Sequence, residues 1–357
     1  MSGGTESKHY GAALLAIIII GVILRVFQVG FQCYWLEEIY TLNLVNNTIT
    51  DVIYLSLFKD CNPPVYYVLA HLASVASGFQ DVAIRYPSVM CGILLIPAMY
   101  LLGQTFKNKM TGLYCAGITA VLYPLVYYSQ FGRAYATVFL FFVVTLIFYL
   151  KLWDEPLTVL KIDTNQIFFL ASATLTVWTH LFAIIPIGLM ILFLFRENLI
   201  KGITSLIVFT GLVVPMFPII GGTQERGAGY GMSLLEMLVI TPTEFFSWIY
   251  PYVGLLFCVG AYQERKRTIT VPLIAITVMT VILGVISSAF TPAFPRYYMT
   301  VSFIIILFGA CACENGLSAL KWSDNAKIAL LFWLMAIVLV IQSPEYLTHY
   351  FVQKYQC

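Results

Sequence analysis

The chain has 357 residues, of which 60% are hydrophobic and only 10% are charged, and its net charge is +2. Its mean hydropathy is +0.88. Soluble domains carry about 25% charged residues, so this composition excludes a soluble globular protein and favours a protein of the bilayer. The sequence has no basic stripe and no charged tail, so no nucleic-acid partner is expected.

Apolar runs divide the sequence into candidate transmembrane helices, each of which needs about 20 residues. The candidates cover residues 11–31, 83–106, 111–128, 134–152, 166–180, 181–195, 202–220, 247–262, 269–290, 297–313 and 327–343. The first run is too long for a signal-peptide core, and no small-residue cleavage site follows it. We therefore predict an all-α, polytopic membrane protein with about 11 transmembrane helices. We expect one domain over 1–357, without a soluble C-terminal domain.

The apolar stretch 64–77 is too short for a typical span and is predicted to be an interfacial or re-entrant helix. The positive-inside rule favours this interpretation. If 64–77 does not cross, the cytoplasmic loops contain Lys8, Lys107, Lys109, Lys151, Lys161, Arg196, Lys201, Arg265, Lys266, Arg267, Lys321 and Lys327. The outer loops then contain only Lys59, Arg85, Arg133, Arg226, Arg296 and Lys354. The prediction is a multi-pass protein of the cell membrane with a cytoplasmic N-terminus.

This topology places two long loops on the extracytoplasmic side. The first covers 32–82 and is expected to contain interfacial helices, and the second covers 221–246 and includes the Gly-rich segment 221–231. A substrate site is expected among these outer loops.

Adjacent carboxylates, Glu37 and Glu38, follow the first apolar run. Ionised groups are unfavourable in hydrocarbon, so acids at the mouth of a spanning helix indicate a functional site. The alternative is a solvated helix start within an interfacial loop.

Further along the first loop, Asp60 and Asn62 precede Pro63-Pro64 and Tyr66. Asp60 could contribute to a site or could serve only as a turn or cap residue. The two prolines fix an extended entry into the helix that contains Tyr66.

Other polar residues at predicted outer helix ends are Gln130, Arg133, Tyr135, His180 and Arg296. A guanidinium matches a phosphate in bidentate geometry, so the arginines could bind an anion. They could instead extend to lipid headgroups. The histidine is expected to fill a hydrogen-bonding role rather than to bind a metal.

An acid opposite an arginine at a lipid-accessible interface suits the transfer of a sugar from a phosphate-bearing lipid. No cofactor is expected and no metal site is assigned, because the sequence lacks DxD and HExxH patterns. A divalent ion held by Glu37, Glu38, Asp60 and His180 is the alternative. The eight cysteines form no CxxC pair, so neither a zinc site nor a disulfide framework is predicted.

Six short motifs in order resemble those of the membrane glycosyltransferases of the C superfamily, in the group of protein O-mannosyltransferases and bacterial aminoarabinose transferases. They are YWLEEIY (34–40), NPPVYY (62–67), RYPS (85–88), YYSQFGRAY (127–135), TH (179–180) and PRY (295–297). The resemblance covers about 20–300. Three positions depart from the family pattern: Glu37 replaces Asp, Asn62 replaces His, and Phe131 replaces a common Glu.

The resemblance implies that a monosaccharide moves, with inversion, from a polyprenyl-phosphate or dolichol-phosphate donor to an extracytoplasmic protein, lipid or glycan. By motif position, Glu37 would be the catalytic base and Glu38 would position it or the acceptor. Arg133 and Arg296 would bind the donor phosphate. The other substrate-binding candidates are Asp60, Asn62, Tyr66, Gln130, Tyr135 and His180. A transporter or flippase of a lipid-linked sugar, a lipid-oligosaccharide ligase and an inactive binding subunit remain as alternatives.

Overall fold

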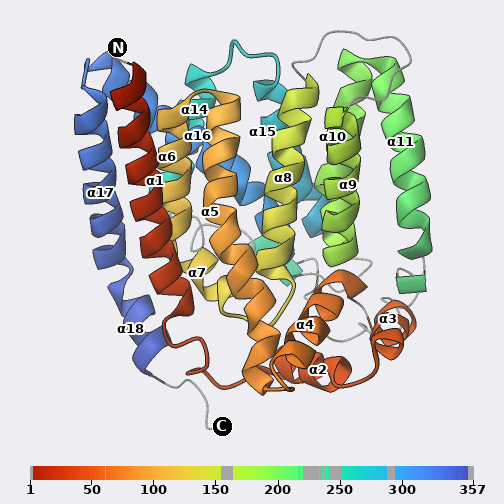
Figure 1. The fold of residues 1–357 in the computed structure, drawn as a ribbon. Helices are drawn as coiled ribbons and strands as arrows, with labels where there is room; N and C mark the ends of the chain where they lie inside the picture. The colour runs from red at the N-terminus through yellow and green to blue at the C-terminus, as the bar shows by residue number, and fades with distance from the viewer. Residues whose placement is uncertain are drawn as a thin grey trace. The chain divides into compact units, whose positions relative to one another are not determined.

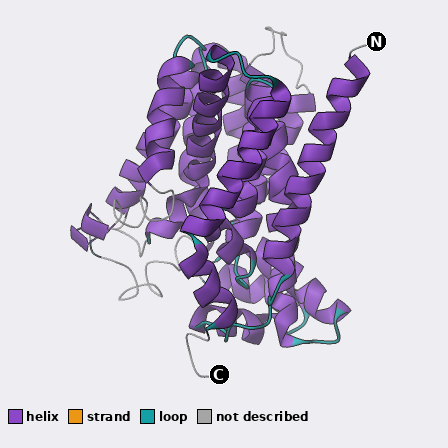
Figure 2. Cartoon of the chain, turned by 90° about the vertical axis from the view of Figure 1, so that its left-hand side faces the viewer, coloured by secondary structure: helices purple, strands orange, loops and turns teal. Residues whose placement is uncertain are grey.

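A computed structural model describes residues 3–60, 62–153, 164–216, 251–287 and 294–352, together with 218–219, 233, 235–236 and 238–240. Helices and loops account for all of these residues, and none of them forms a strand (Figure 2). The predicted all-α class is therefore confirmed. The chain clusters into two compact units, which are described separately. The first is Met1–Ile49, Tyr66–Leu140 and Ala310–Cys357, and the second is Thr50–Val65 and Phe141–Gly309. The single domain over 1–357 stays a prediction.

The first unit is a helix bundle with short helices across one end (Figure 1). Its long helices are α1 (Gly3–Val26), α5 (Tyr86–Phe106), α6 (Lys109–Val121), α17 (Asp324–Ile341) and the end of α16 (Ser302–Ala319). Its short elements are α2 (Leu36–Val45), most of α4 (Pro64–Ala76), η1 (Asp81–Arg85), α7 (Tyr123–Ser129), α18 (Ser343–Phe351) and the start of α8 (Tyr135–Trp153). A Cβ on Gly103 of α5 would lie 2.8 Å from the backbone of Gly112 in α6. Small residues thus let these two helices approach closely.

The second unit contains α3 (Ile49–Phe58), most of α8, and α9 (Thr164–Thr179). It continues with η2 (Leu181–Ala183), α10 (Ile184–Glu197), α11 (Leu199–Val213), η3 (Val214–Met216), α14 (Pro251–Gln263), α15 (Thr270–Ser287), η4 (Pro295–Val301) and the start of α16. Here α10 packs against α11 and α15, and α15 packs against η4. The Tyr298 hydroxyl donates a hydrogen bond of 2.7 Å to the Gly284 carbonyl, which joins η4 to α15.

Each of the eleven predicted apolar segments contains a helix, but the number of spans is not confirmed. Seven helices of the described residues are long and apolar enough to cross a membrane, or up to eight if the bent pair α6 and α7 is one span. Three helices that were predicted to span, α9, α10 and α14, have only 16, 14 and 13 residues. The chain is a multi-pass membrane protein. The stretch predicted at 64–77 is the 13-residue helix α4, and most of the predicted loop 221–246 lies outside the described residues.

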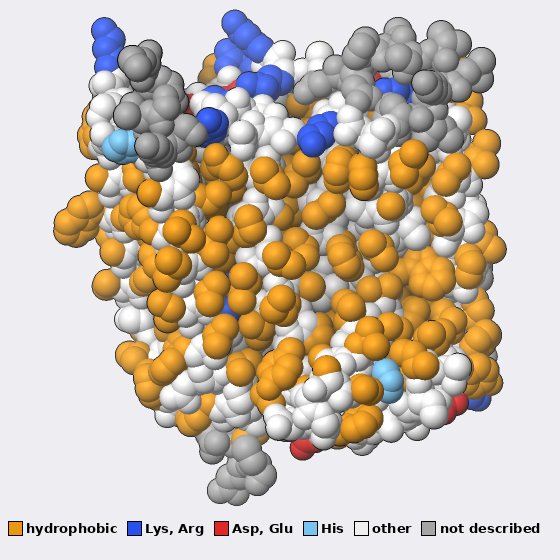
Figure 3. Space-filling view, in the orientation of Figure 1, with side chains coloured by type: hydrophobic (Ala, Val, Ile, Leu, Met, Phe, Trp, Pro, Cys, Tyr) orange, Lys and Arg blue, Asp and Glu red, His pale blue; other side chains and the backbone are white. Residues whose placement is uncertain are grey.

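Outward side chains of the first unit are largely apolar, as a lipid-facing surface requires. Leu15, Ile19 and Ile23 of α1 and Trp333 and Val340 of α17 are all at least half exposed. Figure 3 shows the hydrophobic side chains on this face of the molecule. Most residues in the apolar stretches of α1 and α17 are not buried. These helices therefore suit contact with lipid rather than a position in a protein core.

Figure 3 shows Lys and Arg side chains gathered at the end where α1 begins and α5 ends, which Figure 1 places at the opposite end of the first unit from α2. The Lys107 ammonium lies 2.8 Å from a carboxylate oxygen of Glu314, and Lys327 lies 3.7 Å from the other oxygen. These contacts join the ends of α5 and α16 to the start of α17. The predicted accumulation of lysines on one side therefore has a structural counterpart within this unit.

Arg25, the charge inside the first apolar run, packs against neighbouring helices. Its side chain is fully buried and donates to the carbonyls of Thr119 at 2.8 Å and Ala120 at 3.0 Å. These carbonyls lie in the last turn of α6. The last carbonyls of a helix have no backbone N–H groups within the helix to bind them. The chain bends by 63° between α6 and α7 at this point. Arg25 therefore caps a broken helix.

One expectation about cysteine is wrong. Cys33, which lies between α1 and α2, is disulfide-bonded. The free cysteines of the described residues are Cys91, Cys115, Cys258, Cys311 and Cys313. The scattered spacing in the sequence gave no indication of this bond.

Candidate functional site

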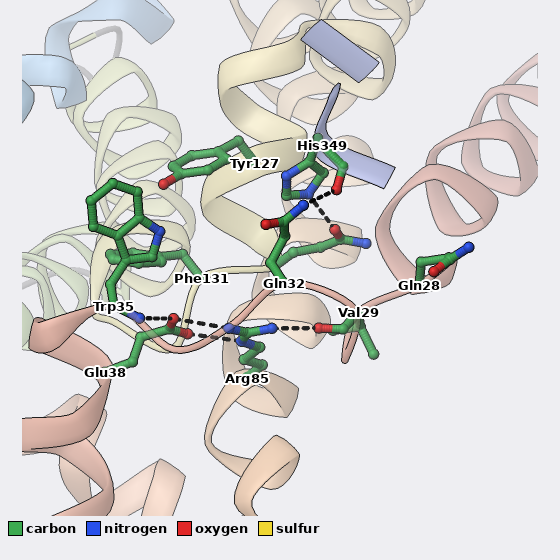
Figure 4. Close-up of a pocket in the computed structure, with 10 residues that line it drawn as sticks. Gln28, Val29, Gln32, Trp35, Glu38, Arg85, Tyr127, Phe131 and His349 are labelled. Carbon is green, nitrogen blue, oxygen red and sulfur yellow. Dashed lines mark hydrogen bonds and ion pairs between the residues drawn. The ribbon is translucent and has the colours of Figure 1, made fainter. Parts of the chain in front are cut away.

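Glu38 forms a buried, two-point ion pair with Arg85. Its Oε1 accepts from Arg85 Nε at 2.8 Å and its Oε2 from Arg85 Nη2 at 2.9 Å (Figure 4). The two side chains are 0% and 3% exposed. Parallel hydrogen bonds of this kind fix both side chains in orientation as well as in distance. The pair therefore joins α2 rigidly to the last residue of η1.

Two backbone amides complete the surroundings of the Glu38 carboxylate. Oε2 accepts from the amide of Trp35, the N-cap of α2, at 3.1 Å, and Oε1 accepts from the amide of Gly132 at 2.7 Å. The first contact is the return half of a capping box, in which the third residue of a helix binds the N-cap amide. A Cβ on Gly132 would lie 2.9 Å from Oε1 and 2.8 Å from Ile84 Cδ1, so any larger residue would displace one of these side chains.

Arg85 is as fully engaged as its partner. Nη1 donates to the Val29 carbonyl at 2.8 Å, and Nη2 donates to the Cys33 carbonyl at 3.3 Å. The guanidinium also lies 4.8 Å from the centre of the Tyr34 ring, where partial burial raises the pKa of the tyrosine. Arg85 therefore organises the whole segment between α1 and α2.

Arg133 reaches the same helix from the loop after α7. Its Nη1 donates to the backbone carbonyl of Glu37 at 3.2 Å, to Thr41 Oγ1 at 3.3 Å and to the Tyr67 hydroxyl at 3.0 Å. Arg133 and Glu37 are both half-buried. Arg133 therefore contacts the first turn of α2 through the backbone of a residue 96 positions away, and the predicted pairing of its guanidinium with the Glu37 carboxylate stays a prediction.

Tyr66 and Tyr135 lie deeper in the first unit. The Tyr66 hydroxyl donates to the Ile84 carbonyl at 2.7 Å and lies 2.9 Å from Ser88 Oγ, and burial raises its pKa. The Tyr135 ring contacts the Tyr128 ring with centroids 4.7 Å apart. Both side chains are less than 10% exposed, so they contact mainly other protein residues rather than solvent.

Gln130 links α1 to α18. Its amide nitrogen donates to the carbonyls of Arg25 at 2.9 Å and Phe27 at 2.8 Å, and its oxygen lies 2.6 Å from His349 Nε2. The Gln32 amide donates to the His349 carbonyl at 2.6 Å. Two glutamines near α1 thus hold the C-terminal helix α18 beside α7.

Asp60, Asn62, His180 and Arg296 belong to the second unit. The Asn62 amide donates to Asp60 Oδ1 at 3.4 Å. In the same unit, the His180 ring lies 4.9 Å from the Tyr297 ring, and the Arg296 guanidinium lies 4.6 Å from the Phe294 ring. The expected convergence of these four residues with Glu37 and Arg133 stays a prediction.

Within the described residues, no three His, Cys, Asp or Glu side chains lie close enough together to hold a metal ion. Both oxygens of Glu38 already accept hydrogen bonds from Arg85 and the backbone. A divalent ion on the Glu37-Glu38 pair would have to displace those contacts. Glu225 and Arg226 of the second predicted loop lie outside the described residues.

Sequence reasoning missed several residues that shape this site. Arg85 was part of the RYPS motif, but nothing in the sequence identified it as the partner of Glu38. Gln32 and His349 were not singled out, because His349 lies beyond the region of motif resemblance and Gln32 belongs to no motif. Only a spatial arrangement brings α18 to the residues after α1.

No protein-family model matches the sequence, and no curated protein matches it either. Several solved structures are similar in fold. ArnT of Cupriavidus metallidurans, an aminoarabinose transferase, superposes with a TM-score of 0.62 and 12% identity over 98% of this chain and 66% of its own. The same protein bound to undecaprenyl phosphate gives a TM-score of 0.61 and 13% identity over 96% of this chain and 65% of its own.

The archaeal oligosaccharyltransferase AglB of Archaeoglobus fulgidus is similar as well. Its structure with an inhibitory peptide and a dolichol-phosphate gives a TM-score of 0.61 and 11% identity over 96% of this chain and 55% of its own. The chain therefore spans just under two thirds of ArnT and about half of the archaeal enzyme. These comparisons show that the chain shares the fold of these two transferases, as the resemblance of its motifs led us to expect.

Proposed function

We propose that the protein is a membrane glycosyltransferase that moves one sugar from a polyprenyl-phosphate donor to an extracytoplasmic acceptor, with inversion. The observation that carries the proposal is the contact of Arg133 with the first turn of α2, at the backbone carbonyl of Glu37. It brings a cation and a carboxylate-bearing residue together in a fold shared with lipid-dependent transferases.

In the proposed reaction, the carboxylate of Glu37 removes the proton of the acceptor hydroxyl. The acceptor oxygen then bonds to the anomeric carbon while the bond from that carbon to the phosphate oxygen breaks, and its electrons leave with the polyprenyl phosphate. The leaving phosphate gains negative charge, which a fixed guanidinium at Arg133 stabilises more than water does. One displacement of this kind inverts the anomeric configuration.

The remaining candidates have supporting or substrate roles in this proposal. Glu38 positions Glu37, because its ion pair with Arg85 fixes the first turn of α2. Tyr66, Gln130 and Tyr135 hold the surrounding helices. Asp60, Asn62, His180 and Arg296 are proposed to bind donor or acceptor.

The proposed topology places this site outside the cell and the N-terminus inside. Disulfides persist in oxidising compartments and are rare in the cytosol, so the bonded Cys33 between α1 and α2 supports an extracytoplasmic site. The lysines at the other end of the first unit support the same orientation.

Arg133→Ala should raise the donor concentration for half-maximal transfer by about 10- to 100-fold, because a hydrogen bond to a charged group contributes about 1.5–3 kcal/mol. Arg133→Lys should recover part of this loss, since lysine keeps the positive charge but lacks the bidentate hydrogen-bonding geometry of the guanidinium. The measurement is release of polyprenyl phosphate from synthetic polyprenyl-phosphate sugars, with the protein in nanodiscs and a membrane extract as the source of acceptor.

Arg265→Ala, at an exposed arginine of the second unit, is the control and should leave the donor dependence unchanged. An unaltered donor dependence in Arg133→Ala would remove the arginine from the phosphate site. Movement of a lipid-linked sugar across the membrane without transfer would support a transporter, and acceptance of only long glycans would support an oligosaccharide ligase.

Cys33 should resist maleimide in intact, right-side-out vesicles until a membrane-impermeant reductant is added, and should then react with membrane-impermeant maleimide. An engineered Lys109→Cys, at the exposed start of α6, should react only after the vesicles are opened. Peptide mass spectrometry identifies each labelled site. Labelling of both positions from the same side would reject the proposed topology.

A further inference from the structure

The turn between α2 and α3 carries the sequence Asn46-Asn47-Thr48. An asparagine followed two positions later by threonine, with any residue except proline between them, is the acceptor pattern for asparagine-linked glycosylation. The pattern occurs once in the sequence. Because so short a pattern also arises by chance, its place in the structure decides whether it can be used. We propose that Asn46 is a glycosylation site and carries an oligosaccharide from a polyprenyl-phosphate or polyprenyl-diphosphate lipid.

The triplet lies on the surface of the first unit. Residues 46–50 are all exposed. Helix α2 ends at Val45 and α3 begins at Ile49, so the triplet lies outside both helices. Exposed turns accept bulky additions because no packed side chain has to move. An oligosaccharide at this position would therefore extend into solvent.

The two neighbouring asparagines differ in their hydrogen bonds. The Asn47 side-chain amide donates to the carbonyls of Asn43 at 2.8 Å and Leu44 at 3.0 Å, which are among the last carbonyls of α2. Asn46 donates through its backbone amide to the Leu42 carbonyl at 3.3 Å, and its side chain forms no hydrogen bond with the described residues. The nitrogen that would be modified is thus the one that does not hold the end of the helix.

Thr48 has a structural role by position as well. It precedes Ile49, the first residue of α3, and so occupies the N-cap, where threonine is favoured. Capping accounts for a threonine at this position but does not account for the asparagine two positions earlier. Aspartate caps a helix as well as threonine does, whereas glycosylation requires serine or threonine. Substitution of Thr48 can therefore separate the two roles.

The side of the membrane is argued from Cys33. This cysteine is disulfide-bonded, and disulfides persist in oxidising compartments outside the cytosol. Between Cys33 and Asn46 the chain forms one helix, α2, of 10 residues, whereas a spanning helix needs about 20. Both residues therefore lie on the same side of the membrane, which is the side where asparagine-linked glycans are added.

The modification forms a bond from Asn46 Nδ2 to the anomeric carbon of the oligosaccharide. Nδ2 gives up one proton to a base of the glycosylating enzyme. The bond from the anomeric carbon to the phosphate oxygen breaks, and its electrons leave with the lipid phosphate. This modification does not require the proposed transferase activity of the chain and shares only its proposed topology.

The glycan would not cover the proposed catalytic residue. Glu37 lies in the first turn of α2, and Asn46 follows the last turn. At about 1.5 Å per helical residue, the two ends are about 13 Å apart. We therefore expect Asn46→Gln to leave sugar transfer by this chain unchanged.

The test is glycopeptide mass spectrometry on the full chain isolated from the membranes of its own organism. The wild type should carry an oligosaccharide on Asn46. Asn46→Gln should lose it completely, and so should Thr48→Asp, which keeps a capping residue for α3. Thr48→Ser, the matched control, keeps the acceptor pattern and should remain glycosylated, as should Asn47→Gln.

An unmodified Asn46 in the wild type, or a glycan that persists in Thr48→Asp, would overturn the inference. The first result is read without any variant, so a folding defect does not affect it. An unmodified chain that still transfers sugar would overturn this inference alone. A chain glycosylated on Asn46 that transfers sugar from no polyprenyl-phosphate donor would support this inference and overturn the proposed function.

Discussion

Glu37→Gln should lower the turnover of sugar transfer by about 10²- to 10⁴-fold, the range that a general base contributes. The amide matches the carboxylate in shape but cannot accept the proton of the acceptor hydroxyl at neutral pH. The donor concentration for half-maximal transfer should change little, because the phosphate is proposed to bind Arg133. Single-turnover transfer in nanodiscs, with donor saturating, measures the effect.

Two further variants separate catalysis from folding. Glu37→Asp restores the residue that the resembled family carries, and it should stay within about 100-fold of the wild type, since the carboxylate moves by one methylene. Asp81→Asn removes an exposed acid from the first turn of η1 in the same unit, and it should be neutral. Near wild-type turnover in Glu37→Gln would reject its role as the base.

The sequence predicted the helices of this protein well because the signal for them is local. Apolar runs such as 269–290 and 327–343 become α15 and α17, since a buried or lipid-facing helix needs little more than length and composition. The number of transmembrane helices was harder to predict from the sequence. Segments such as 166–180 and 181–195 yield helices of only 16 and 14 residues, and composition does not decide whether these cross.

The site was partly predictable for a different reason. Motif order singled out Glu37, Glu38 and Arg133 as candidates, and the Arg133 guanidinium lies at the backbone carbonyl of Glu37, while their catalytic roles stay a prediction. The partner of Glu38 could not be inferred, because Arg85 lies 47 residues away and its chemistry alone also suits a lipid headgroup. Likewise, the contribution of α18 depends on the packing of His349 against Gln130, a contact across 219 residues.

Breaking the Glu38–Arg85 pair should have the largest effect on stability. Arg85→Met would leave a buried carboxylate with two backbone amides and no counter-ion, and loss of one partner of a buried pair costs about 3–5 kcal/mol. It would also leave the carbonyls of Val29 and Cys33 without the donors seen in the structure. The thermal unfolding midpoint in detergent should fall, and transfer should fall with it, because the first turn of α2 is released.

The pair of Arg267 and Glu264, in which only the arginine is solvent-exposed, provides a control. It has the same 2.8 Å separation, but the arginine side chain is 43% exposed. Solvent screens the arginine end of this pair, so Arg267→Met should cost less stability than Arg85→Met. The comparison tests burial rather than distance as the source of the effect. Equal losses in the two variants would contradict a special role for the buried pair.

The double variant Glu38→Leu with Arg85→Met tests whether the pair matters only because it contains two opposite charges. Apolar replacement of both partners of a buried ion pair is often neutral or stabilising. Here the amides of Trp35 and Gly132 would lose their acceptor, and each orphaned group costs about 1–3 kcal/mol. We therefore expect the double variant to be more stable than Arg85→Met but less stable than the wild type. Full recovery of the unfolding midpoint would show that the pair acts only as two charges, whereas partial recovery identifies Glu38 as the acceptor that organises the turn carrying Glu37.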